Sequence, residues 1–161
     1  MSAALDLVPV PHHPFDFEEY LRRVEAARGR RVYLHDLPAA AVGAICGLWI
    51  ATAGGDHIFV APGAVGLLRV NILLHEISHM LLGHGKVTGD VGAALTQLLN
   101  GGGQAEGVLA RSRYDTHEER HAEMLAALIL TRASQPEQAG QGDELSMLGD
   151  VMGYPMGGDR A

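Results

Sequence analysis

The sequence predicts an α+β domain in which a small three-stranded sheet packs on two helices that are rich in histidine and glutamate. Apolar residues recur at helical spacing through residues 65–82 and again through residues 116–132. Short segments rich in β-branched and aromatic residues lie between residues 31 and 61. The 161 residues are enough for one domain with a core of its own.

The elements can be justified in chain order. Asp16 is suited to cap the first helix, and Gly29 to end it. The last two strand segments enclose a glycine-rich turn and predict a hairpin. Thr116 with Glu119 three residues later reads as a capping box at the start of the last strong helix. The expected elements are a helix at 17–28, strands at 31–35, 46–52 and 57–61, a helix at 65–82, a short helix at 93–99 within a glycine-rich loop, a helix at 116–132 and a weak helix at 144–152.

Composition limits the domain plan and the partners. A single domain is expected at residues 15–133, between an irregular lead-in at 1–14 and a loosely ordered tail at 134–161. The net charge of −7 and the lack of a basic stripe argue against direct nucleic-acid binding. We expect neither a signal peptide nor a transmembrane helix, and hence a cytoplasmic protein with no membrane partner. The lone Cys46 lies in an apolar run and is expected to be buried.

The helix expected at 65–82 carries the pattern HExxH at residues 75–79. His75 and His79 are four residues apart, so both imidazoles lie on one helical face and can bind one zinc ion. Glu76 beside that face can act as the catalytic base that takes a proton from a water molecule activated by the metal. Apolar flanks predict that this helix is buried, where unpartnered histidines and a glutamate would be costly.

A catalytic zinc ion needs a third protein ligand, and the helix at 116–132 is its best source. His121 lies at the edge of the apolar face of that helix and is the first choice. Glu118 and Glu119 are the alternative third ligands. Glu119 and Glu123 can instead act as outer acceptors that orient a ligand histidine.

Further residues are candidates for supporting roles. His84 follows the motif helix and can contact a ligand, face substrate or cap the helix end. A donor must also stabilise the oxyanion of a hydrolytic reaction, and His84, Tyr114 and Tyr154 are candidates. The strand at 57–61 is the candidate edge strand for binding an extended peptide beside the motif helix.

The sequence HEISHMLLGH at residues 75–84, followed by a helix of the form E-x-x-A-E-x-L-A-A-x-I-L, resembles the ImmA/IrrE-like metallopeptidases. The resemblance covers roughly residues 30–132. It implies a zincin-like α+β fold and a zinc ion held by His75 and His79, with Glu76 as general base. Members of this bacterial family have a narrow substrate range, and the better-known ones cleave a helix-turn-helix repressor.

The sequence therefore predicts a zinc-dependent metalloendopeptidase acting on a protein substrate, with a helix-turn-helix repressor as the candidate partner. One alternative is a non-catalytic zinc-binding protein, toxin-like or regulatory, that acts by binding a repressor. Another is an interaction domain without metal. The glutamate between the two histidines favours catalysis, because metal binding alone does not require it.

Overall fold

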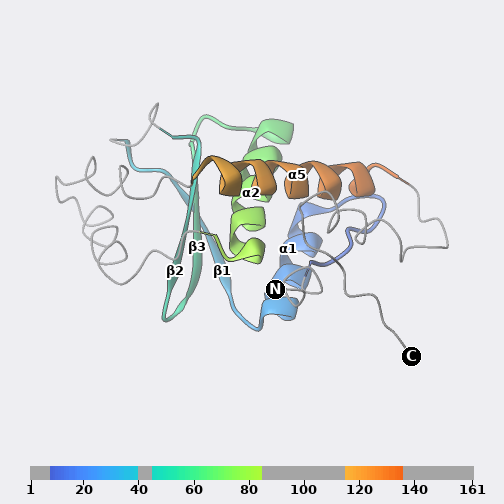
Figure 1. The fold of residues 1–161 in the computed structure, drawn as a ribbon, viewed down its shortest axis with the longest axis horizontal. Coiled ribbons are helices and arrows are strands. Elements are labelled where there is room, and N and C mark those ends of the chain that lie inside the picture. Colours follow the sequence, from blue (N-terminus) through green and yellow to red (C-terminus); the bar gives the residue numbers. More distant parts are fainter. Residues whose placement is uncertain (1–7, 40–44, 85–114, 136–161) are drawn as a thin grey trace.

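The computed structural model describes residues 8–39, 45–84 and 115–135, and within them it is an α+β fold with three helices and one small mixed sheet (Figure 1). The predictions of helices at 17–28, 65–82 and 116–132, which fall in the described residues, are confirmed to within one residue at each end. The elements are α1 (Phe17–Arg28), β1 (Val32–Asp36), β2 (Gly47–Thr52), β3 (Gly55–Val60), α2 (Gly66–Leu82) and α5 (Thr116–Ala133).

The sheet has the strand order β1-β3-β2. β2 and β3 form the predicted hairpin and pair antiparallel, whereas β1 pairs parallel with β3. The prediction that the third strand lies at the edge is wrong, since β3 is central and β2 is an edge strand. β1 pairs with β3 although β2 lies between them in the sequence, and strand propensity does not encode such a non-local pairing.

α2 lies against the sheet, and α5 crosses over α2 (Figure 1). Its apolar residues make α2 the centre of the core, where Leu74, Ile77 and Met80 are fully buried. α2 contacts both β2 and β3 on one side and α5 on another. Gly83 ends α2 in the left-handed conformation with φ 71°, which a glycine adopts without steric cost. This packing leaves the histidines of α2 in the angle between the sheet and α5.

The N-cap of α5 lies one residue earlier than predicted. Asp115 is the N-cap, accepting hydrogen bonds from the backbone N–H groups of His117 and Glu118, and Glu118 completes the capping box. The predicted box of Thr116 and Glu119 is therefore wrong, because an aspartate one position earlier makes the same bonds. The shift assigns the capping role to Glu118 and leaves the carboxylate of Glu119 available for other contacts.

A buried carboxylate joins α1 to the sheet and to α2. Asp56 of β3 is fully buried and accepts hydrogen bonds from Arg28 at 3.0 Å, from Arg30 at 3.2 Å and from the Trp49 indole at 3.2 Å. Arg28 also donates to the carbonyl oxygen of Met80, at 3.0 Å. The charge is thus paired and hydrogen-bonded, as a buried ion must be.

The remaining predictions concern Cys46, membrane spans and the segments outside the described residues. Cys46 is exposed beside the start of β2, so its predicted burial is wrong; the apolar run around it turns inward only from Leu48 onward. None of the helices in the three described ranges is long and apolar enough to cross a membrane. The helices expected at 93–99 and 144–152, the start of the lead-in and most of the tail lie outside the described residues.

Candidate metal centre

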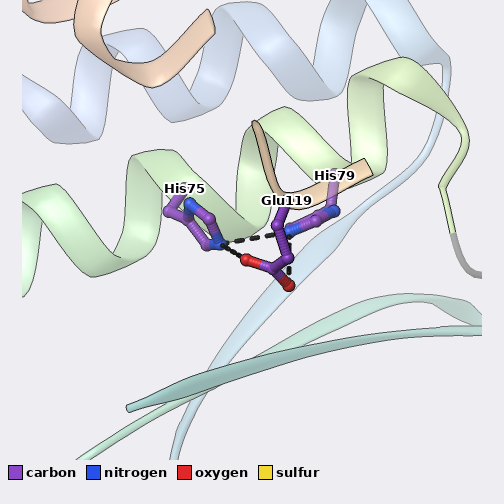
Figure 2. A group of neighbouring side chains, drawn as sticks. All are labelled: His75, His79 and Glu119. Carbon is purple, nitrogen blue, oxygen red and sulfur yellow. Dashed lines mark hydrogen bonds and ion pairs between the residues drawn. The ribbon is translucent and has the colours of Figure 1, made fainter. Parts of the chain in front are cut away.

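Side chains from α2 and α5 converge on one point. His75 and His79 project from one face of α2 toward Glu119 of α5 (Figure 2). The Nε2 atoms of the two histidines are 3.1 Å apart, and the Glu119 carboxylate oxygens lie 3.2 Å from His75 Nε2 and 3.6 Å from His79 Nε2. One donor atom from each residue lies within 4.8 Å of the others, so the three can hold a metal ion.

These distances suit a small tetrahedral ion. Two ligand atoms that are each about 2.05 Å from a tetrahedral zinc ion are about 3.3 Å apart. The observed nitrogen–nitrogen and nitrogen–oxygen distances of 3.1–3.6 Å bracket that value. The two imidazole rings meet edge to face, with centroids 4.7 Å apart, so their Nε2 lone pairs can point to a common centre. The donor set, two imidazoles and a carboxylate, is one that zinc binds in catalytic sites.

Helix geometry explains why Glu119 rather than His121 meets the pair. Residues of a helix are about 100° apart, so positions 119 and 121 point about 160° apart around the axis. Glu119 faces His75 and His79 on one flank of α5. His121 is buried on the other flank, where its ring lies 4.0 Å from that of His117 and 6.1 Å from that of His84. The structure therefore favours the alternative ligand, Glu119, over the first choice, His121.

Glu76 is buried next to this centre. Burial and, second, the negative charge of Glu119 raise the pKa of Glu76 to about 8, and a hydrogen bond from the Trp49 backbone offsets part of that rise. Its Oε2 atom is buried and accepts no hydrogen bond from any residue that the structure describes. An unsatisfied buried carboxylate oxygen is costly, so it marks a place for a water molecule or a bound group.

β2 approaches Glu76 closely because Gly47 has no side chain. A Cβ atom at position 47 would lie 2.6 Å from Glu76 Oε1 and 2.8 Å from Ile72 Cγ2. Contacts this short require a shift of one of the groups. Gly47 is not among the predicted site residues, and its only signal in the sequence is a glycine at the start of a β-rich segment.

His84 contacts the buried side of His79. The Nδ1 atoms of the two rings are 3.2 Å apart, and the side chains are buried. When the proton of a neutral His79 is on Nδ1, donated to His84, the Nε2 lone pair faces His75 and Glu119. Ligand histidines are commonly oriented by such a partner on the second ring nitrogen. His84 is thus placed for the predicted role of contacting a ligand.

The electrostatic surroundings keep these rings neutral. Burial, followed by the charges of His75 and His84, lowers the pKa of His79 to about 3. Burial is also the main cause of a lowered pKa of His84, which the negative charge of Glu118 partly offsets. A neutral imidazole has the lone pair that metal ligation needs.

The remaining predicted site residues lie elsewhere. Glu118 is half-buried in the capping box, and Glu123 is exposed on α5 one turn after Glu119. Tyr114 and Tyr154 lie outside the described residues. No family model matches the chain, and no curated protein or solved structure is significantly similar to it.

Proposed function

We propose that this protein is a zinc-dependent metalloendopeptidase with a zincin-like arrangement of its two site helices. The observation that carries the proposal is the convergence of His75, His79 and Glu119 on one point, beside the buried and unsatisfied carboxylate of Glu76. Three protein ligands leave one tetrahedral position open, which distinguishes catalytic zinc sites from structural ones.

Bound zinc supplies a Lewis acid that polarises the scissile carbonyl and makes water acidic enough to attack near neutral pH. The chain supplies the proton transfer. Glu76 has a raised pKa of about 8, so it can take a proton from the attacking water and pass it to the leaving amine. A cation at the centre would lower the pKa of Glu76, because it favours the ionised carboxylate that must act as base.

β2 supports the binding of an extended peptide. It is an edge strand of the described sheet, and its first residue lies against Glu76. Extended peptides commonly bind by adding a strand to an exposed sheet edge through main-chain hydrogen bonds. A substrate strand that paired with β2 in this way would have its main chain next to the carboxylate of Glu76. The resemblance to ImmA/IrrE-like metallopeptidases supports a helix-turn-helix repressor as the substrate class.

The proposal is tested with the substitution Glu76→Gln, which keeps the size of the side chain but removes the base. The variant should retain zinc and lose cleavage of a co-expressed helix-turn-helix repressor by about 100-fold or more, measured by mass spectrometry of the fragments. Wild-type protein is compared in parallel with and without a chelator.

Full cleavage by Glu76→Gln would refute the proposed mechanism. A repressor that is bound and inactivated, but not cut, by both proteins would favour the non-catalytic zinc-binding alternative. In that case His75→Ala should abolish the effect and Glu76→Gln should not.

A further inference from the structure

α5 carries a second pair of histidines with the spacing of the pair on α2. His117 and His121 are four residues apart, and their ring centroids are 4.0 Å apart with an interplanar angle of 67°. The corresponding values for His75 and His79 are 4.7 Å and 81°. The two imidazoles lie on one helical face with their rings in edge-to-face contact, as those of His75 and His79 do, and the spacing of four residues is the one that lets two histidines of a helix bind one ion.

This second pair is separate from the candidate catalytic centre. Position 119 points about 160° away from positions 117 and 121, since successive helical residues are about 100° apart. An ion bound by His117 and His121 therefore cannot share the carboxylate of Glu119. The first pair lies on α2 and faces the flank of α5 that carries Glu119. The second pair lies on α5 itself, on the opposite flank.

His84 is not a ligand of a second ion while it supports the first centre. Its ring lies 6.1 Å from that of His121, and its Nδ1 lies 3.2 Å from His79 Nδ1. A neutral imidazole has one lone pair. If His84 accepts the His79 proton at Nδ1, its Nε2 carries hydrogen and cannot bind a metal. Two protein ligands, His117 and His121, are left for the second ion.

The surroundings allow an ion to reach this pair. His117 is exposed and His121 is buried, so the pair is open to solvent on the His117 side. The acidic residues Asp115 and Glu118 lie in the same helical turn as His117.

We propose that His117 and His121 form a second binding site for a divalent transition-metal ion, with water completing the coordination. Two imidazoles suit Zn²⁺, Ni²⁺ or Cu²⁺ better than Ca²⁺ or Mg²⁺, which prefer oxygen ligands. With two protein ligands, the site binds more weakly than the three-ligand centre. It does not depend on the proposed catalytic function.

The test is equilibrium dialysis of the full chain against increasing Zn²⁺, with metal measured per chain. Wild type should take up one tightly bound and one more weakly bound zinc ion. His117→Ala should lose only the weaker ion, and Glu119→Ala should lose tight binding but keep the weaker site. A His12→Ala, His13→Ala double variant should behave as wild type, which separates the site from the histidine pair near the N-terminus.

Two results would overturn the proposal. One is unchanged weak uptake in His117→Ala, and the other is loss of weak uptake in the His12→Ala, His13→Ala variant. Circular dichroism of each variant establishes that it is folded, and the exposure of His117 makes alanine well tolerated there. Glu119→Ala distinguishes a failure of this proposal from a failure of the first centre, because only the first centre uses Glu119.

Discussion

Glu119 shows how one position in a helical turn acquires a distinct role from its neighbours. Within the first turn of α5, Glu118 closes the capping box and Glu119 turns toward His75 and His79. The Glu119 side chain is 40% exposed, so its carboxylate is partly hydrated and ready to exchange water for a cation. Glu123, one turn later, is exposed and serves as a natural comparison.

Glu119→Ala is expected to weaken zinc binding at the first centre by about 100-fold or more, because it removes one of the three proposed ligands. Zinc affinity is measured by competition with a chromogenic chelator. Glu123→Ala should leave that affinity unchanged, and so should His121→Ala. If His121→Ala weakens tight zinc binding and Glu119→Ala does not, the assignment of the third ligand is wrong.

At this scale the sequence reveals part of the site. The spacing of His75, Glu76 and His79 is local, and an apolar helical pattern is enough to place all three. The third ligand depends on which flank of α5 faces α2, and this is set by tertiary packing. The sequence favours His121 because it lies at the edge of the apolar face of the helix, whereas His75 and His79 meet the flank that carries Glu119. The sequence pattern identifies the apolar face but not the flank that turns toward the histidine pair.

β2 acts on the site through its backbone. Because Gly47 has no Cβ, the strand passes directly beside the Glu76 carboxylate. The Trp49 backbone also donates a hydrogen bond to that carboxylate, which favours its ionised form. The edge strand therefore fixes the position of Glu76, the proposed base.

Gly47→Ala should displace the Glu76 carboxylate, because the new Cβ would lie 2.6 Å from its Oε1 atom. We expect cleavage to fall by about 100-fold, the effect of a misplacement on the order of 1 Å, with zinc content unchanged. Gly54→Ala in the hairpin turn is the matched control, since its Cβ would meet only Thr52 Oγ1 at 3.9 Å. Equal activity of the two variants would show that close approach at Gly47 is not needed.

The elements themselves were largely predictable, and their arrangement was not. Asp16 and Gly29 delimit α1 as expected, and Gly83 ends α2. The hairpin followed from its glycine-rich turn. The central position of β3 depends on β1 pairing with it from the opposite side, and strand-forming residues alone do not specify a partner.

Two buried carboxylates have opposite consequences for the whole molecule. Asp56 is surrounded by Arg28, Arg30 and the Trp49 indole, which connect α1 and the sheet. Glu76 is near another carboxylate and has an unsatisfied oxygen. Asp56 is thus compensated within the fold, whereas Glu76 is destabilising when ionised unless a cation or proton is present.

The metal-free protein should therefore lose stability as the pH rises from 6.5 to 8. Folded Glu76 holds its proton up to about pH 8, but the unfolded side chain releases it near its ordinary pKa of 4.5, so higher pH favours unfolding. His79 acts in the opposite direction, since its folded pKa of about 3 lies below the ordinary 6.5, but that effect is confined to lower pH. The Glu76 contribution is at most about 1.4 kcal/mol per pH unit.

Urea unfolding in the presence of a chelator measures this dependence. Glu76→Gln has no titratable proton at this position, so its free energy of unfolding should change less with pH between 6.5 and 8 than that of the wild type. Identical slopes for wild type and Glu76→Gln would mean that the pKa of Glu76 is not raised in the fold.

The contact between α2 and α5 also reduces the entropy that the chain loses when it binds an ion. His79 and Glu119 are about 40 residues apart along the chain, and bringing such distant points together in a flexible chain costs about 3 kcal/mol in its length-dependent part. Packing of α5 on α2 has already closed that loop before any ion arrives. The folded chain should thus bind the ion about 200-fold more tightly than the same three side chains on an unstructured chain. The hydrophobic core acts here as the rigid frame of a chelator.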